Sequence, residues 1–176
     1  MIKHITLTNF LSYGPTTRAV ELRALNVIIG PNGSGKSNLI EALELLRATP
    51  KDLLTPVRDG GGVRDWLWKG AAKLPTATID AVVDNPKALV PLRYVLSFTE
   101  VGQRFEILDE RVENASPDRG HQRPYFYYRF ENGHGVLNVK GKERRLQHED
   151  IDPVASILAQ RKDPDQYPEL TYLGNA

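Results

Sequence analysis

Gly30-Pro31-Asn32-Gly33-Ser34-Gly35-Lys36-Ser37 is the stretch that decides the fold of this chain. It fits the pattern G-x-x-x-x-G-K-[ST], which defines the phosphate-binding P-loop. An apolar run of strand length, residues 25–29, precedes it, and an amphipathic helical pattern over residues 38–47 follows it. Strand, glycine-rich loop and helix are the context in which this motif binds phosphate. The stretch therefore predicts a nucleotide-binding unit whose strand is central in a sheet and buried on both faces.

Each residue type in this loop has a chemical role. Gly33 and Gly35 have no Cβ, so the backbone N–H groups of the loop are free to converge on phosphate oxygens. We expect Lys36 to reach the β- and γ-phosphates and the Ser37 hydroxyl to bind Mg²⁺. Asn38 is placed to donate a hydrogen bond to the α-phosphate. The sequence thus predicts a triphosphate site at the start of the helix.

Composition sets broad limits on the class of protein. The chain has 176 residues, 40% hydrophobic and 26% charged, as expected of one globular domain. A formal net charge of +1 means that any contact with a polyanion must come from a local patch. Without cysteines there is no disulfide framework and no thiolate zinc site. The four histidines lack the spacing of metal ligands, and we expect them to be ordinary surface residues: His4, His121, His134 and His148.

No stretch of the sequence resembles a targeting or membrane-spanning segment. Residues 1–6 are not followed by the apolar region of a secretory signal, and no apolar run approaches the length of a membrane span. We therefore expect a cytoplasmic protein without a membrane partner.

Beyond the P-loop the pattern predicts mainly strands. The helix after the loop carries Leu39, Leu43 and Leu46 on one stripe, with Ile40 beside it, and ends at Thr49-Pro50. Glycine-rich and irregular sequence fills residues 51–75, a charged loop is expected at 114–123, and a helix is expected to begin at Asp152-Pro153. Asn132-Gly133 predicts a hairpin turn. Strands are predicted at residues 2–9, 17–22, 76–83, 92–98, 103–112, 125–130 and 135–140.

These elements predict an α/β fold, in which a P-loop core carries a largely antiparallel β layer. The expected parts are a P-loop core (1–50), an irregular segment (51–75), a β-rich lobe (76–150) and a C-terminal helix and loop (151–176). We expect these parts to belong to one domain.

Three clusters have both a structural and a functional interpretation. The segment 63–68 contains both tryptophans, and we expect it to pack at the domain edge, with Arg58 or Arg64 near the nucleotide or a partner as the alternative. The aromatic run 125–130 is typical of cross-strand packing, with base stacking as its alternative. The basic residues Lys140, Lys142, Arg144 and Arg145 indicate a solvated turn or a contact with phosphates or an acidic partner.

The N-terminal layout resembles the head domain of the SMC/RecF-like branch of ABC-type AAA ATPases. The resemblance rests on I-x-L-x-N-F-x-S-Y at residues 5–13, followed by I-x-G-P-N-G-S-G-K-S-N-x-I-E-A at residues 28–42. It covers the first 47 residues closely and the β-rich lobe only in pattern. Members of this branch act in chromosome organisation, DNA repair and phage defence.

The resemblance implies a set of site residues and cofactors. ATP and Mg²⁺ would be the cofactors, and Lys36 the catalytic residue. Residues 11–13, including Ser12 and Tyr13, would lie near the adenine, and Arg58 or Arg64 would match an arginine loop. Gln160 would touch the Mg²⁺, with Gln147 and Gln166 as weaker candidates. The phosphates would be bound by Asn32, Gly33, Ser34, Gly35, Lys36, Ser37 and Asn38.

This sequence lacks three parts of the resembled head. The family hydrolyses ATP with a Walker B strand that ends in Asp-Glu, a signature L-S-G-G loop and a switch histidine. The nearest match to Walker B is Ile107-Leu108-Asp109-Glu110, which we expect to lie in the antiparallel layer. We therefore interpret the chain as the N-terminal half of a longer ATPase that hydrolyses ATP only with its C-terminal half and a second head, bound through ATP. DNA is a further candidate partner.

Two other functions also use a P-loop. A small-molecule or nucleotide kinase would need an arginine-rich lid, for which the loop 114–123 offers only Arg119 and Arg123. A non-catalytic module would use nucleotide only to order an interaction surface. A GTPase is disfavoured because the guanine motif N-K-x-D is absent.

Overall fold

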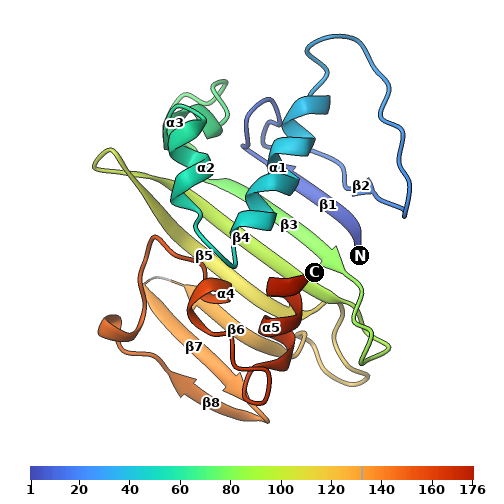
Figure 1. Cartoon of the computed structure of the whole chain (residues 1–176), viewed down its shortest axis with the longest axis vertical. Helices are drawn as coiled ribbons and strands as arrows, with labels where there is room; N and C mark the ends of the chain where they lie inside the picture. Colours follow the sequence, from blue (N-terminus) through green and yellow to red (C-terminus); the bar gives the residue numbers. More distant parts are fainter. Residues whose placement is uncertain (132) are drawn as a thin grey trace.

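A single twisted antiparallel sheet forms the centre of the molecule (Figure 1). This computed structural model describes residues 1–131 and 133–176. Within them the sheet has eight strands in the order β2-β1-β3-β4-β5-β6-β7-β8, so that every strand from β3 onward pairs with the next one along the chain. The strands are β1 (Ile2–Thr8), β2 (Val20–Glu21), β3 (Ala77–Val83), β4 (Leu92–Val101), β5 (Arg104–Asn114), β6 (Phe126–Glu131), β7 (His134–Val139) and β8 (Lys142–Arg145).

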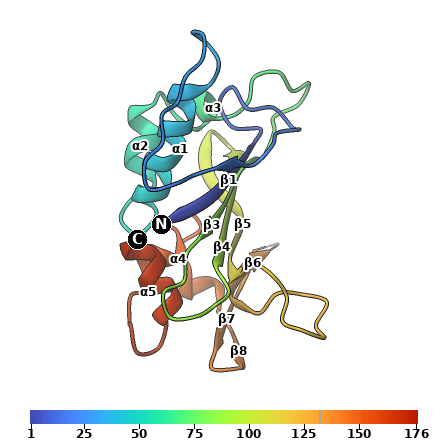
Figure 2. The same cartoon turned by 90° about the vertical axis from the view of Figure 1, so that its right-hand side faces the viewer.

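The helices cover one face of this sheet. Figure 2 shows α1, α2 and α5 on the same side, with the sheet seen nearly edge-on. The α-helices are α1 (Lys36–Ala48), α2 (Leu54–Asp59), α3 (Val63–Trp66), α4 (Ile157–Gln160) and α5 (Pro168–Asn175), and a 3₁₀ turn, η1, spans His148–Asp150. The antiparallel β layer is thus confirmed, and residues 51–75, expected to be irregular, contain two short helices.

Alternation along the strands explains the core. In β3 the residues Ala77, Ile79, Ala81 and Val83 are buried and their neighbours are half-exposed, so one face packs under the helices. Two aromatic residues of the run 125–130, Tyr128 and Phe130, are buried in the same core, as cross-strand packing predicts.

Two-residue turns join two pairs of neighbouring strands. Gly102 and Gln103 connect β4 to β5, and Lys140 and Gly141 connect β7 to β8; all four have positive φ, as the tight hairpin turn requires. The predicted hairpin between β6 and β7 is confirmed by their pairing, although Asn132 itself lies outside the described residues. Sequence reasoning missed β8, an exposed strand at the sheet edge formed by the basic residues expected in a turn.

The helix after the P-loop is confirmed, but its buried stripe is shifted. Leu39, Ala42 and Leu45 face the core, whereas Ile40 is 51% exposed. The predicted stripe shares Leu39 but has Leu43 and Leu46 in place of Ala42 and Leu45, each one position further along the chain. Periodicity alone does not fix which side of a helix meets the sheet. The helix ends as expected at Thr49, whose hydroxyl donates to Leu46 O (2.7 Å).

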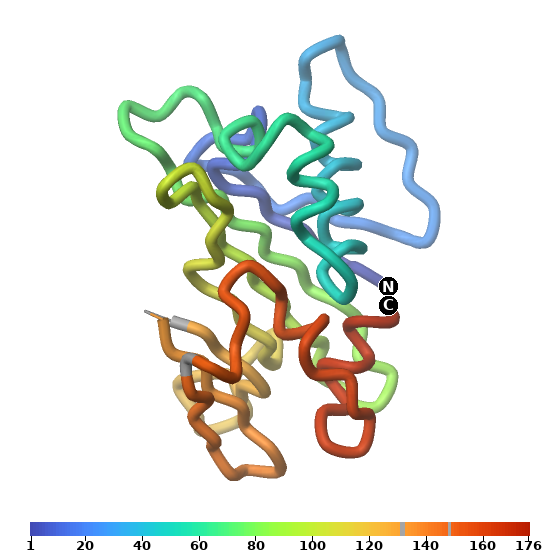
Figure 3. The backbone as a smooth tube through the Cα atoms, turned by 60° about the vertical axis from the view of Figure 1, so that its left-hand side comes forward, coloured from blue at the N-terminus to red at the C-terminus, as the bar shows by residue number. Residues whose placement is uncertain are grey.

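The predicted central strand at residues 25–29 is not formed in this chain. This segment has no helix or strand, and it loops away from the sheet in Figures 1 and 3. Its apolar side chains are exposed, Leu25 by 83%, Val27 by 80% and Ile29 by 89%. A buried strand needs hydrogen-bonded neighbours, and every strand of the described sheet pairs elsewhere. The α/β unit expected here is therefore reduced to the loop and its helix.

Three smaller predictions also need correction. The second strand is shorter than predicted, β2 covering only two residues of the predicted 17–22. The helix expected at Asp152-Pro153 begins at Ile157 instead, because Ser156 caps it by accepting from Leu158 N (3.1 Å). Within the predicted C-terminal helix and loop, where Tyr167-Pro168 indicates a break in the chain, Pro168 instead starts α5, since proline fits the first position of a helix.

Candidate functional site

The glycines of the P-loop adopt the backbone that the motif requires. Gly33 and Gly35 have φ values of 80° and 88°, in the left-handed region, and Gly35 caps α1. At Gly30 an added Cβ would lie 2.8 Å from Ser34 Oγ, so the loop closes tightly on itself. The chain therefore enters α1 through a turn that presents backbone groups and the first turn of the helix together.

The ammonium of Lys36 lies inside this loop. Its Nζ donates to Gly30 O (2.7 Å) and Pro31 O (2.6 Å), with Ser34 Oγ at 3.4 Å. Three acceptors thus hold the positive charge at the mouth of an exposed loop, where phosphate oxygens would meet it. The neighbouring Ser37 is exposed at the start of α1, so its hydroxyl fits the expected contact with Mg²⁺.

Residues 12 and 13, expected from the resemblance to lie near the adenine, contact the P-loop and the first turn of α1. Tyr13 Oη donates to Gly35 O (3.1 Å), and Asn38 Nδ2 donates to Ser12 Oγ (2.7 Å). Burial raises the pKa of Tyr13, which keeps the phenol in its donating form. Two segments more than twenty residues apart in sequence thereby form one polar rim beside the phosphate-binding turn.

The tryptophan segment holds this rim in place from behind. Leu11 N donates to Trp66 O (2.9 Å), and Trp68 N donates to Asn9 O (2.9 Å). The buried Trp66 ring also contacts the ring of Phe10, with centroids 5.6 Å apart. The expected packing of the tryptophan segment at the domain edge is confirmed. Sequence reasoning missed that the backbone of this segment anchors residues 9–13.

Neither candidate arginine extends a free side chain toward the loop. Arg64, in α3, forms a bidentate pair with Glu100 at the end of β4, with distances of 2.9 and 3.1 Å. Arg58, in α2, lies 3.3 Å from Thr55 Oγ1. The hydrogen bond from Leu11 N to Trp66 O places α3 next to residues 9–13. Of the two arginines, Arg64 therefore lies on the helix that contacts the segment beside the P-loop.

The structure does not bring Gln160 to Ser37. Its amide is used locally, with Nε2 donating to Ala155 O (2.7 Å) and Oε1 accepting from Asp152 N (3.0 Å). Helix α4, which carries it, lies beside the C-terminal end of α1, opposite the P-loop (Figure 1). The weaker candidates Gln147 and Gln166 lie in η1's cap and in the turn before α5.

The Walker B-like sequence lies in the antiparallel core, as expected. Glu110, in β5, is buried and accepts from Tyr94 Oη (2.7 Å), from the Ser156 hydroxyl and from Ile157 N (2.9 Å). Burial raises the pKa of this carboxyl group. All of its contacts are internal, so this carboxylate supports the packing of α4 on the sheet.

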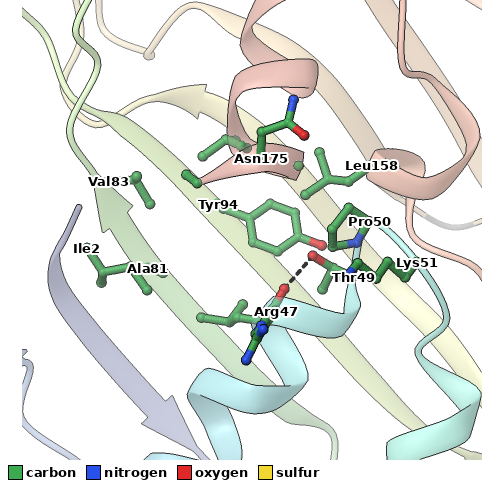
Figure 4. Close-up of a pocket in the computed structure, with 14 residues that line it drawn as sticks. Ile2, Arg47, Thr49, Pro50, Lys51, Ala81, Val83, Tyr94, Leu158 and Asn175 are labelled. Carbon is green, nitrogen blue, oxygen red and sulfur yellow. Dashed lines mark hydrogen bonds between the residues drawn. The ribbon is translucent and has the colours of Figure 1, made fainter.

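Two hollows flank α1. One, of about 450 Å³, lies at its C-terminal end between the sheet and α5; Figure 4 shows apolar Ile2, Ala81 and Val83 on one wall and Thr49 and Tyr94 across from them. It contains none of the predicted site residues. The other, of about 620 Å³, lies between the exposed segment 25–29 and α1 and includes Tyr13 and Lys36 in its wall. Of the residues predicted to bind nucleotide, Tyr13, Ser34 and Lys36 line the second hollow.

The described residues hold no group of three His, Asp or Glu side chains arranged to bind a metal ion. No helix of that part of the chain has the length and apolar character to cross a bilayer.

Known proteins are similar to this chain in sequence. Residues 25–129 match the family described as "AAA domain, putative AbiEii toxin, Type IV TA system". Among relatives, the chromosome partition protein Smc of Cereibacter sphaeroides is 37% identical over 90 residues, 49% of this chain and 8% of that protein. Smc of Lactiplantibacillus plantarum is 29% identical over 177 residues, 92% of this chain and 14% of that protein.

A shorter match has a higher identity. Smc of Synechococcus sp. is 52% identical over 42 residues, which cover 24% of this chain and 4% of that protein. The chain thus spans less than a sixth of the length of these relatives. The matched range includes the P-loop, α1 and the strands β3 to β5. The chain belongs to this AAA domain family and is an SMC-like ATPase domain of the nucleotide-binding type.

Proposed function

We propose that this chain is the ATP-binding half of an SMC/RecF-like ATPase head. The observation that carries the proposal is the loop around Lys36, closed by Gly30 and bordered by the Ser12–Asn38 contact. A triphosphate at this loop would receive backbone N–H groups at the helix start and the ammonium of Lys36. Ser37 would bind Mg²⁺, which supplies charge neutralisation at the β- and γ-phosphates.

Hydrolysis would need groups from outside this chain. Phosphoryl transfer depends on positioning a nucleophile and on neutralising charge, and the one buried Glu of the Walker B-like sequence, Glu110, is committed to internal contacts. We propose that the C-terminal half of the same protein supplies the missing carboxylates, and a second head, joined through ATP, the signature loop. The isolated chain would then bind nucleotide and turn it over very slowly.

The exposed apolar segment 25–29 gives the C-terminal half a place to dock. Four of its five residues are apolar and exposed, and its backbone has no strand partner in the described sheet. An unpaired apolar run of this kind pairs with a strand from elsewhere. We propose that pairing converts 25–29 into the central strand before the P-loop.

For the biological process we rely on the names of the relatives and the family description as support. Three relatives are named chromosome partition proteins and the family description names a toxin–antitoxin system. These support a cytoplasmic ATPase in chromosome maintenance, DNA repair or phage defence. DNA would contact the exposed basic strand β8 and the turn before it.

A kinase is less well supported. Its lid would be the loop 114–123, and Figure 1 shows the connection between β5 and β6 at the end of the molecule opposite the start of α1. Arginines there are far from closing over phosphates at the P-loop.

Binding of a fluorescent ATP analogue tests the proposed site. Lys36→Ala should abolish binding while the thermal melting curve stays close to that of the parent chain, since Lys36 is bonded only within its own exposed loop. Lys51→Ala, just beyond the other end of α1, is the matched control and should bind normally. Unchanged affinity in Lys36→Ala would place the nucleotide elsewhere and refute the proposal.

A further inference from the structure

The hollow at the C-terminal end of α1 has the size and lining of a small-ligand pocket. Its volume of about 450 Å³ falls within the range of about 300–1,000 Å³ that is common for such pockets. Apolar side chains from five elements form most of its wall: Ile2 of β1, Leu46 of α1, Ala81 and Val83 of β3, Leu158 of α4 and Leu173 of α5. It shares no lining residue with the hollow beside the P-loop, so a ligand in it would be separate from the nucleotide.

A smaller hollow of about 280 Å³ continues this one past the end of α5. The two share five lining residues: Pro50, Lys51, Leu158, Gly174 and Asn175. Together they form an elongated space between the turn after α1 and the last turn of α5. A space of this shape fits an extended chain better than a compact ring.

The polar side chains inside the larger hollow are already hydrogen-bonded. Thr49 Oγ1 donates to Leu46 O (2.7 Å), and Tyr94 Oη donates to Glu110 Oε1 (2.7 Å). Figure 4 shows both residues across from the apolar wall. A peptide in this space would bury backbone N–H and C=O groups that find no free partners there. The interior therefore favours an alkyl chain, which has no polar groups, over a peptide segment.

Unpaired cations border both hollows. Arg47 lines the larger one, Lys162 lines the smaller one, and Lys51 lines both; all three are exposed. Within the part of the chain that the structure describes, none of these three side chains forms a hydrogen bond or an ion pair. No Asp or Glu side chain lines either hollow. The border is thus complementary to an anionic head group, which would attract it through water and be screened by salt.

We propose that the two hollows bind a free aliphatic carboxylate, of the chemical class of a fatty acid. The alkyl chain would lie along the apolar wall between Ile2 and Leu173, and the carboxylate would stay at the border with Arg47 and Lys51. Burial of the chain supplies most of the affinity, and the exposed cations supply a smaller part. This site lies at the opposite end of α1 from the P-loop and does not depend on ATP.

Displacement of cis-parinaric acid, a fluorescent fatty acid, tests the proposal in this chain and in the full-length protein. Each competitor is kept below its micelle-forming concentration. Dodecanoate should compete better than dodecanol, which lacks the charge. Each methylene added between octanoate and dodecanoate should tighten binding about fourfold, the effect of burying one methylene group. Equal competition by dodecanol, or no gain with chain length, would overturn the proposal.

Two kinds of variant locate the binding. Ala81→Leu should abolish it, because the added atoms occupy the larger hollow. Arg47→Gln and Lys51→Gln should each weaken dodecanoate binding about twofold to fivefold, the contribution of one exposed ion pair, and leave dodecanol binding unchanged. Lys73→Gln makes the same change on the loop before β3, outside both hollows, and should bind as the parent does.

The two kinds of variant also decide against the site. Unchanged binding in a folded Ala81→Leu, or in both glutamine variants, would refute it. The glutamine variants alter exposed residues, so they decide the matter where Ala81→Leu does not fold.

Three further outcomes identify other ligands, and each would overturn the proposal. Binding by this chain but not by the full-length protein would show that the downstream half fills the hollows. Displacement of the probe by Mg-ATP would place the probe at the P-loop. Co-sedimentation with phosphatidylglycerol vesicles that is lost in Arg47→Gln would show that the ligand is a membrane surface and not a free fatty acid.

Discussion

Gly35 shows how one residue connects the loop, the helix and the rim. It has a left-handed φ of 88°, and a Cβ added there would lie 3.0 Å from Ser12 Oγ. Gly33 has a similar φ of 80° with open space around it. The two glycines therefore carry the same backbone strain on substitution but differ in what an added methyl group would displace.

Substituting these glycines separates strain from contact. Gly33→Ala should cost about 1–2 kcal/mol of folding free energy, the strain of a non-glycine residue in this region. Gly35→Ala should cost more folding free energy than Gly33→Ala. It should also weaken nucleotide binding more, because the added methyl group displaces Ser12 from Asn38. Urea denaturation and nucleotide titration of the two variants check this. Equal losses in both would mean that the Ser12 contact has no role.

The buried Glu110 predicts a pH dependence of stability. Burial raises its pKa in the folded state above the ordinary value of about 4.3. A raised carboxyl pKa means that the folded state binds the proton more strongly than the unfolded state does. The stabilisation that results is full below about pH 4.3 and is lost as the pH rises through the folded-state pKa. The ion must then be held in the core.

Glu110→Gln tests this sign. Glutamine does not ionise. Its single carbonyl oxygen can still accept from Tyr94 Oη, whereas its NH₂ group then replaces the oxygen that accepts from Ile157 N, a cost that does not vary with pH. The variant should therefore gain stability relative to the parent chain as the pH moves from mildly acidic to mildly alkaline, measured by denaturation at several pH values. A difference that does not change with pH would show that Glu110 keeps an ordinary pKa.

At the residue level, the sequence predicts what depends on local chemistry. The loop glycines, Lys36 and the neighbouring Ser12 and Tyr13 lie together because the motif itself defines a geometry. Arg64 and Gln160 could not be assigned in this way, because their partners are distant or specific to this fold. Glu100 lies 36 residues from Arg64, and nothing in the local pattern indicates that pair.

Among the elements, strands with one buried face were predictable and the P-loop strand was not. Period-two alternation marks β3 to β7 because one face of each lies against the core. The segment 25–29 has strand composition, yet it pairs with no strand of the described sheet, and pairing depends on neighbours that local sequence does not reveal. Similarly, α4 begins where Ser156 caps it and not at the equally plausible Asp152.

Charging the exposed segment tests its proposed role. Val27→Asp should change the stability of this chain by less than about 0.5 kcal/mol, because Val27 is 80% exposed. It should prevent association with the C-terminal half, since a charge in a central buried strand is costly. Size-exclusion chromatography of the mixture measures this. Leu89→Asp, on another fully exposed residue, is the control, and normal association of Val27→Asp would contradict the pairing.

For the molecule as a whole, the charge distribution matters more than the net charge. A net charge of +1 gives no overall attraction to DNA, and the exposed cations gather on the hairpin from Lys140 to Arg145. Reversing its four basic residues to glutamate in the full-length protein should weaken DNA binding and reduce the slope of log affinity against log salt by up to about 3.6, or about 0.9 for each phosphate contact. An unchanged slope would exclude this surface.

The central claim is that this chain holds the ATP while the rest of the head supplies the catalytic groups. Steady-state ATP turnover, measured for the chain alone and after mixing with the downstream half of its protein, tests the claim most directly. We predict very slow turnover by the chain alone, a large increase in the mixture, and none in a mixture made with Lys36→Ala. Vigorous hydrolysis by the isolated chain would contradict the account.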